Sequence, residues 1–329
     1  MKPKNIIRRS IGICIFSLCS LLATAPALTA AETTSRPLQI VVPFAPGGSN
    51  DIVGRAVANL LTTRLHRSVI IENKPGAGGT IGSEKVARAA SDGNTLLLIS
   101  STFTMNPSVM KLNYDPVDSF IPVALLGQGP SVIAVNASLP VNSVRELIEY
   151  TRKNPGKVNF GSSGVASFQH FAVELFKLKT GADLTIVHYK GGAPALVDLA
   201  SGNVQVALGS LIQMQPYVNS GKVKILSVAG PERVALIPDI PTLKEEGIDV
   251  DATNWWGIMA PKGTPGDIVE ALHRDINAVL SNPKLKDSLA SEGAQITSAT
   301  REQFDQRIAE ETKKWAAVAQ QTGLDHSQK

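Results

Sequence analysis

One pattern recurs along this 329-residue chain: a short β-branched strand, a glycine-rich loop and an amphipathic helix. The first copy has "LQIVV" as the strand, "PFAPGGSND" as the loop and "IVGRAVANLLTTRL" as the helix, in which apolar residues return with helical spacing. Further copies begin at "SVIIEN", "KVNFGSSG" and "LTIVHY", and the run "TLLLIS" is apolar enough to be buried on both faces. Strands that alternate with helices predict an α/β fold with largely parallel sheets.

Two long segments interrupted by proline or glycine break this alternation. "FIPVALLGQGPSVIAVN" is predicted to cross between two lobes, and "GPERVALIPDIPTLKEEG" to return, with hinges near 124–130 and 228–234. The predicted division is 36–127 plus 232–329 for lobe 1, and 128–231 for lobe 2.

The first 31 residues have the pattern of a secretory signal peptide. A basic start, "MKPKNIIRRS", precedes an apolar run of roughly 15 residues, shorter than the ~20 that span a bilayer, and small residues that predict cleavage near Ala30 or Ala31. Residues 1–31 hold four of the 32 basic residues and none of the 28 acidic ones, so the remaining chain is balanced and has no charge excess to attract nucleic acid. Both cysteines, Cys14 and Cys19, leave with this segment. We therefore expect a periplasmic protein without disulfides or cysteine-ligated metal.

Four glycine-rich loops stand where strands lead into helices: "PGGSND", "PGAGGTIG", "GSSGVAS" and "KGGAPA". Glycine permits positive φ and close approach of the backbone, and a helix N-terminus favours an anion. The alternative is that each loop is a tight turn whose polar residue caps a helix, as Ser49 or Asn50 is expected to do. Four such loops in one chain favour a shared cleft. "GAGGTIG" resembles a dinucleotide fingerprint but follows the second strand, so no cofactor is predicted.

No catalytic or metal-binding spacing is present in the sequence. None of the five histidines lies in an H-E-x-x-H pattern, and "GSSG" is not a G-x-S-x-G nucleophile elbow. Two alternatives to a binding protein remain open: an exported α/β hydrolase that uses Ser162 or Ser163 with His170, and a structural or adhesive protein with no saturable small ligand.

The motifs together resemble one family. "VPFAPGGSNDIVGR", "VIIENKPGAGGTIGSEKVARAASDGNTLL", "NFGSSGVASFQHFAVELFK", "YKGGAPALVDLASGNVQ" and "WWGIMAPKGTP" are similar to the substrate-binding receptors of tripartite tricarboxylate transporters, also called Bug receptors. The resemblance extends over residues 36–325. It implies a bilobed periplasmic binding protein of the type II Venus-flytrap kind that closes on a small carboxylate. Such a receptor is not an enzyme, needs no cofactor or metal, is expected to be a monomer, and serves permease subunits or a sensor.

The resemblance also implies which residues bind the ligand. Backbone N–H groups and hydroxyls would hold the carboxylate, and Asp51 would orient the loop or an ordered water rather than meet the anion. The implied residues are Phe44, Gly47, Gly48 and Asp51 in the first loop, Gly78 and Gly79 in the second, Ser101 and Thr102 after the third strand, and Ser162, Ser167 and His170 in the far lobe.

This chain departs from the family pattern at two places that help to shape the distal side of the pocket. Ile186 and His188 stand where His and Pro are frequent, and Gly209-Ser210 stands where an acid and an amide are common. Loss of the acid disfavours a ligand that carries an ammonium group, but the sequence leaves the identity of the ligand open.

Overall fold

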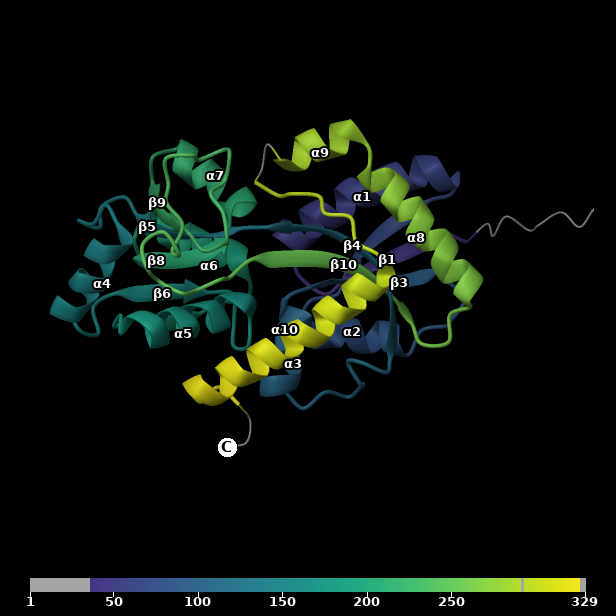
Figure 1. Cartoon of the computed structure of the whole chain (residues 1–329), viewed down its shortest axis with the longest axis horizontal. Helices are drawn as coiled ribbons and strands as arrows, with labels where there is room; N and C mark the ends of the chain where they lie inside the picture. The colour runs from purple at the N-terminus through teal and green to yellow at the C-terminus, as the bar shows by residue number, and fades with distance from the viewer. Residues whose placement is uncertain (1–35, 291–292, 326–329) are drawn as a thin grey trace, which may run out of the picture. The chain divides into compact units, whose positions relative to one another are not determined.

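The structure is a computed structural model that describes residues 36–290 and 293–325, so the predicted signal peptide lies outside the described residues. The described residues form two five-stranded sheets with helices packed against them (Figure 1). We call each sheet with its helices a lobe.

The first lobe takes its elements from the two ends of the described chain. They are β1 (Leu38–Val42), α1 (Ser49–Leu65), β2 (Val69–Asn73), the 3₁₀ turn η1 (Ala77–Gly79), α2 (Thr80–Ala87), β3 (Thr95–Ser100), α3 (Thr102–Val109), β4 (Phe120–Gly129), β10 (Asn254–Pro261), α8 (Gly266–Leu280), α9 (Pro283–Ala290) and α10 (Arg301–Thr322). The second lobe is continuous in sequence. It contains β5 (Ser131–Asn136), α4 (Val144–Lys153), β6 (Asn159–Ser162), α5 (Phe168–Thr180), β7 (Thr185–His188), α6 (Gly192–Ser201), β8 (Val206–Ser210), α7 (Leu211–Asn219) and β9 (Val223–Val228).

The two sheets have the same arrangement of strands, and each contains both parallel and antiparallel pairings. The orders are β2-β1-β3-β10-β4 and β7-β6-β8-β5-β9. The α/β architecture is confirmed, and β1–β3 and β6–β8 are parallel as expected. The remaining pairings are antiparallel, so the sheets are less parallel than the sequence predicts. The reason is that β4, β5 and β10 carry the chain between the lobes and join the sheets without a crossover helix.

The two crossings differ from one another. Only Pro130 separates β4 from β5, whereas residues 229–253 form a long return segment. Its apolar side chains, such as Val234 and Leu243, are buried in clusters of the second lobe, and Ala252 N donates to Ala229 O over 2.8 Å. The lobe limits drawn from the sequence stay predictions, and we propose that the return crossing lies near 252–254 rather than near 228–234.

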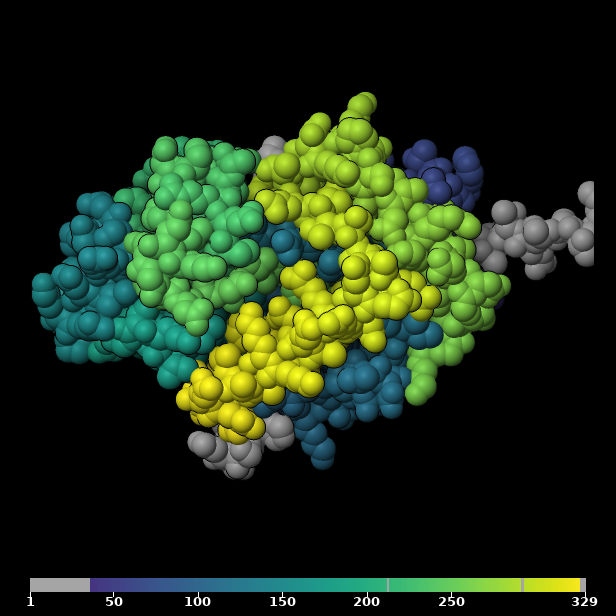
Figure 2. All heavy atoms as spheres, in the orientation of Figure 1, coloured from purple at the N-terminus to yellow at the C-terminus, as the bar shows by residue number. Residues whose placement is uncertain are grey.

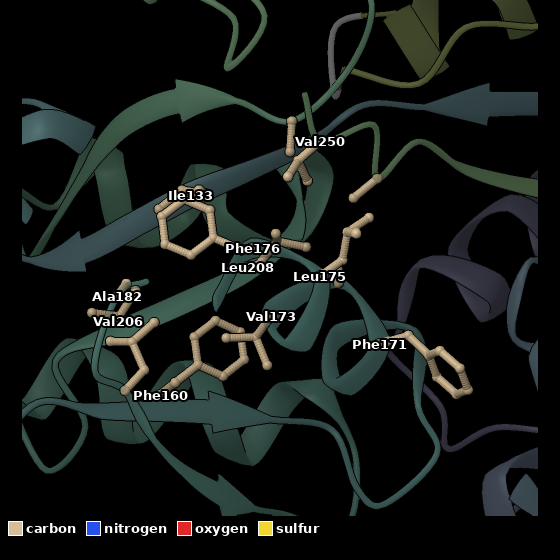
Figure 3. Packing of buried hydrophobic residues seen from close by; sticks show 14 of the residues in the cluster. Ile133, Phe160, Phe171, Val173, Leu175, Phe176, Ala182, Val206, Leu208 and Val250 are labelled. Atoms are coloured by element: carbon tan, nitrogen blue, oxygen red, sulfur yellow. The ribbon is translucent and has the colours of Figure 1, made fainter. Parts of the chain in front are cut away.

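Close packing of large apolar side chains holds the second lobe together (Figure 3). Phe160 on β6 and Phe176 on α5 are each 2% exposed and lie near Val206 of β8.

The run Leu96–Ile99 of β3, in the first lobe, is at most 1% exposed, which confirms that this strand is buried on both faces. Burial on this scale, at about 25 cal/mol per Å² of apolar surface, is the main stabilising term of such a fold.

Helix α10 belongs to the first lobe by position but packs on both lobes. It contacts α3 and β4 of the first lobe and α5 of the second, and Figure 2 shows it as the yellow ridge on this face. The ring of Trp315 lies edge-on to Phe168 and Phe171, with centroids 6.3 and 5.8 Å away. The helix begins with a capping box formed by Thr300 and Gln303. No helix within residues 36–290 and 293–325 is long and apolar enough to cross a membrane.

Candidate ligand-binding site

The first glycine loop joins β1 to α1 and gives its two glycines different roles. Gly47 has φ +80°, which side chains other than glycine rarely adopt, whereas Gly48 has an ordinary φ of −79°. The need for positive φ that the sequence suggests for the pair therefore falls on Gly47 alone. Gly48 is the N-cap residue of α1, and its carbonyl accepts from the N–H groups of Asp51 and Ile52, both over 3.0 Å.

The expectation that Ser49 or Asn50 caps α1 is wrong. Both residues lie within the first turn, and no side chain caps the helix. Asn50 is buried instead, since its Oδ1 accepts from Trp256 Nε1 over 2.8 Å and its amide group donates to Ser100 over 3.4 Å. Packing against β3 and β10 thus takes the side chain away from the cap position. The helix N-terminus consequently keeps backbone N–H groups for another acceptor.

Asp51 is 4% exposed and holds the loop from inside. Its Oδ2 accepts from Gly47 N over 3.0 Å, and Arg55 and Asn73 donate to the carboxylate over 2.9 Å. Burial alone would raise the pKa of Asp51, but the hydrogen bonds from Arg55, Gly47 and Asn73 outweigh it and lower the pKa below its ordinary value. The carboxylate stays ionised, and its charge is matched by Arg55.

The second loop lies against the first. Gly78 and Gly79 have φ of +62° and +96°, and a carbon added to Gly79 would lie 3.3 Å from the ring of Phe44. The Asn106 amide donates to Gly78 O over 3.1 Å, and the carbonyl of Phe44 accepts from Asn73 over 3.1 Å. The structure therefore brings Phe44, the first loop and the second loop together.

Ser101 and Thr102 follow β3 but are almost fully buried, at 0 and 4% exposure. The Ser101 hydroxyl donates to Asn254 Oδ1 over 2.5 Å and so ties β3 to the start of β10. Although the two residues lie at the end of the strand, as the resemblance implies, Ser101 already has a protein partner.

In the second lobe, Ser162, Ser167, His170 and His188 form one polar cluster. The Ser162 hydroxyl donates to Gly164 O over 3.0 Å and lies 3.2 Å from Ser167 Oγ and 3.3 Å from His188 Nδ1. The rings of His170 and His188 meet edge to face, with centroids 4.6 Å apart. Burial lowers the pKa of His170 to about 4, and the charges of His188 and Lys177 act in the same direction. Burial lowers the pKa of His188 as well.

The contacts of this cluster do not match the Ser–His pair of the hydrolase alternative. His170 Nδ1 accepts from the Ala166 N–H over 3.2 Å, and Ser163 donates to Gln169 Oε1 over 2.6 Å. In the described part of the chain, neither Ser162 nor Ser163 forms a hydrogen bond to His170. A general base must lie within hydrogen-bond reach of the nucleophile's proton.

Sequence reasoning missed Gln169 and Gln213. A small cavity beside the cluster is lined by Gly161, Ser163, Gln169, Gly192, Ala195, Leu196, Ala207, Leu208, Gly209 and Gln213. Gln213 belongs to no motif, although the departure at Gly209-Ser210 already pointed to the end of this strand. Its amide nitrogen would lie 3.8 Å from a carbon added to Gly48, so it brings the second lobe to the first loop.

A larger cavity of about 400 Å³ lies among α8, α9 and the start of α10, and it shares no lining residue with the glycine loops. We place the candidate site at the loops because backbone donors and polar side chains of both lobes meet there. Among the described residues, no group of histidine, cysteine, aspartate and glutamate side chains could hold a metal ion.

Comparisons with known proteins identify the family and the fold. Residues 53–324 match the family described as "Tripartite tricarboxylate transporter family receptor". Protein BugT of Bordetella pertussis is 36% identical over 293 residues, which cover 88% of this chain and 90% of BugT. The structure of the periplasmic binding protein BugD has a TM-score of 0.83 at 35% identity and covers 88% of this chain and 98% of its own. An R. palustris protein solved with adipate has a TM-score of 0.85 at 32% identity, with 88 and 98% covered. The fold is therefore the bilobed periplasmic binding protein fold, and the chain belongs to the receptor family of tripartite tricarboxylate transporters, the Bug receptors.

Proposed function

We propose that this protein is a periplasmic receptor that binds a small carboxylate between its two lobes. It delivers the ligand to the permease subunits of a tripartite transporter or presents it to a sensor. The observation that carries the proposal is the uncapped N-terminus of α1 at Gly48, which faces Gln213 of the other lobe. The adipate bound by the R. palustris relative supports the same ligand class.

The electrostatics of the first loop favour a backbone-held anion. Arg55 is paired with Asp51, with nitrogen and oxygen 2.9 Å apart, so its charge is already matched. The donors that remain are the N–H groups that begin α1, and a helix N-terminus stabilises an anion without a cationic side chain. The proposed contacts are Gly48 and the first N–H groups of α1, with Phe44, Gly78 and Gly79 as walls. Gly47 shapes the loop, because its own N–H already donates to Asp51 Oδ2.

We further propose that the protein is not an enzyme. The hydroxyl of Ser162 donates to Gly164 O, and the histidine that it contacts is His188, so the predicted Ser–His170 pair has no support from the contacts. Prolonged incubation of the purified protein with the bound acid distinguishes the two functions, since a receptor returns the acid unchanged and a hydrolase turns it over.

The first test identifies the ligand. The purified protein is denatured and the released small molecules are analysed by mass spectrometry, and we expect an organic acid in amounts approaching one per protein. Release of no acid, together with no binding in titrations against carboxylates, would contradict the proposal and favour a structural role.

The second test locates the anion. Gly48→Val should fold, because φ is ordinary and an added carbon would lie 3.6 Å from Ala45 O, its nearest neighbour. The side chain would nevertheless fill the space in front of α1 and nearly abolish binding. Lys190→Gln is the control, since Lys190 is exposed, and its effect should stay under about 1 kcal/mol. Normal binding by Gly48→Val with loss in Lys190→Gln would replace the backbone site with an ion pair.

Residues 1–31 would direct export and be removed near Ala30 or Ala31. N-terminal sequencing of protein from the periplasm should return a start near residue 31, and an intact Met1 would refute this part of the proposal.

A further inference from the structure

The first turn of α1 contains two backbone N–H groups without an acceptor among the described residues. The N–H groups of Asp51 and Ile52 donate to Gly48 O, both over 3.0 Å, whereas those of Ser49 and Asn50 have no such partner within residues 36–290 and 293–325. At a helix start, such groups are satisfied by a side chain, by water or by a ligand. A side chain that reached them would compete with the proposed carboxylate.

The side chain best placed to compete is that of Asn50. Asn50 is the second residue after the N-cap of α1, and Glu302 has the same place in the first turn of α10. There, a hydrogen bond from its own backbone N–H lowers the pKa of Glu302. An asparagine oxygen can accept in the same way, because asparagine side chains readily bond to nearby backbone N–H groups. In α1, such a bond would close the anion site.

Trp256 prevents this bond in the structure. Its Nε1 donates to Asn50 Oδ1 over 2.8 Å, and the Asn50 amide group donates to Ser100 Oγ over 3.4 Å. Asn50 is 6% exposed and Trp256 is 1% exposed, so water does not take the place of either partner. The Asn50 oxygen is therefore bound in the core and does not cap the start of α1.

The strands around Trp256 fix the direction of its indole N–H group. Trp256 lies on β10, where it pairs with Ser100 of β3 and with Gly127 of β4. The far end of the ring lies against Gly129, since a carbon added to this glycine would be only 2.7 Å from Trp256 Cη2. Gly129 thus leaves room for the indole, and any side chain at this position would displace it.

We propose that Trp256 and Asn50 are positioning residues of the anion site. The indole N–H binds Asn50 Oδ1, so the Asn50 side chain cannot cap α1 and the first N–H groups of the helix stay available to a carboxylate. Neither side chain touches the ligand. The inference rests on the proposed function, because it assigns what keeps the site at α1 open. The neighbouring Trp255 has no such role, since its Nε1 has no hydrogen-bond partner among the described residues.

The two ends of this hydrogen bond can be removed separately, and the two losses should differ in effect. Trp256→Phe releases the Asn50 oxygen, which then caps α1 and weakens binding about tenfold, as expected when one hydrogen bond competes with the ligand. Asn50→Ala removes the same bond together with the competing oxygen, so its affinity should stay within about threefold of wild type. Both variants should be less stable in urea denaturation, because each loses a buried hydrogen bond.

A double variant separates positioning from a merely structural role. Asn50→Ala added to Trp256→Phe should restore the affinity to within about threefold of wild type, whereas two structural defects would weaken binding further. Gly129→Ala displaces the ring without removing its N–H group, so it should also weaken binding and be rescued by Asn50→Ala. This variant carries the test if Trp256→Phe does not fold. Trp255→Phe is the matched control and should leave the affinity within about threefold, because its indole has no bond to lose.

Isothermal titration with acetate, succinate, malate, adipate and citrate measures these affinities, after circular dichroism has confirmed folding. The acid that the wild-type protein binds most tightly is then used for every variant. Wild-type affinity in Trp256→Phe and Gly129→Ala would overturn the inference, and so would a double variant that binds no better than Trp256→Phe. The proposed function would stand in both cases. If the wild-type protein binds none of the five acids, the proposed function itself fails.

Discussion

Replacing Asp51 with asparagine should destabilise the first glycine loop, because its carboxylate accepts three hydrogen bonds there and makes a further ion-pair contact with Arg55. Oδ2 accepts from Gly47 N over 3.0 Å and from Arg55 Nε over 2.9 Å. Oδ1 accepts from Asn73 over 2.9 Å and pairs with the second Arg55 nitrogen at the same distance. Asparagine keeps one side-chain oxygen as an acceptor. Its NH₂ group replaces the other oxygen and would face two N–H donors without accepting from either.

The size of the effect follows from burial. The Asp51 side chain is 6% exposed, and Arg55 is 50% exposed, so water replaces part of the arginine contact. A hydrogen bond to a charged group contributes about 1.5–3 kcal/mol, and the substitution removes two of them. The contribution of the bond from Arg55 is smaller, because Arg55 is partly exposed to water. We expect Asp51→Asn to lower the free energy of unfolding at pH 7 by about 2–3 kcal/mol.

The effect should also depend on pH with a defined sign. Because the folded-state pKa of Asp51 is lowered from 3.8, its contribution is complete above the unfolded-state pKa and is lost as pH falls through the folded-state value. The difference in unfolding free energy between wild type and variant should therefore be constant above about pH 5 and shrink below about pH 4.

Urea denaturation followed by circular dichroism measures this difference. Asp275→Asn is a matched control, since Asp275 pairs with Arg64 over 2.9 Å at the surface of the same lobe and should change stability by less than about 1 kcal/mol. Equal losses in the two variants, or a difference that grows as the pH is lowered, would refute the role assigned to Asp51.

Two further predictions concern the contacts between the lobes. Trp315→Ala should lower the free energy of unfolding by about 3–5 kcal/mol, because Trp315 is 1% exposed and packs on Phe168 and Phe171; a loss below about 1 kcal/mol in urea denaturation would contradict this packing. Saturation with the acid released from the purified protein should reduce the radius of gyration in small-angle scattering, since contacts from both lobes favour closure. An unchanged radius would indicate a preformed pocket.

The sequence predicted the elements whose information is local. Strand–loop–helix units and the buried run of β3 both depend on residues close together in the chain. It could not predict that β10 would lie between β3 and β4 in antiparallel pairing, because this partner comes more than a hundred residues later. The later return crossing that we propose rests on the same kind of information, since Val234 and Leu243 are buried through tertiary contacts with the second lobe.

The same limit applies to the site. The glycine loops could be found because positive φ and helix starts have a local signature, as Gly47 and Gly79 show. The missing cap at Ser49 and the position of Gln213 have no such signature. Asn50 is drawn into the core by Trp256, and Gln213 matters only because another lobe brings Gly48 close to it. Contacts between segments far apart in sequence decide which polar groups remain free for a ligand.

Helix α10 restricts how the lobes can move apart. Trp315, Val318 and Ala319 are buried in one cluster with side chains of α5, so an opening that broke this contact would expose apolar surface. Exposing Trp315 by separating α10 from α5 should cost about as much as truncating this side chain to alanine, which is about 3–5 kcal/mol. To shift the equilibrium between open and closed protein from 1:99 to 99:1, a ligand needs about 5.5 kcal/mol of differential affinity for the closed state. A small acid could not easily offset the cost of exposing Trp315 in addition. Opening should therefore keep α10 packed on α5 and move Gly48 away from Gln213, where the ligand supplies the bonds that favour closure.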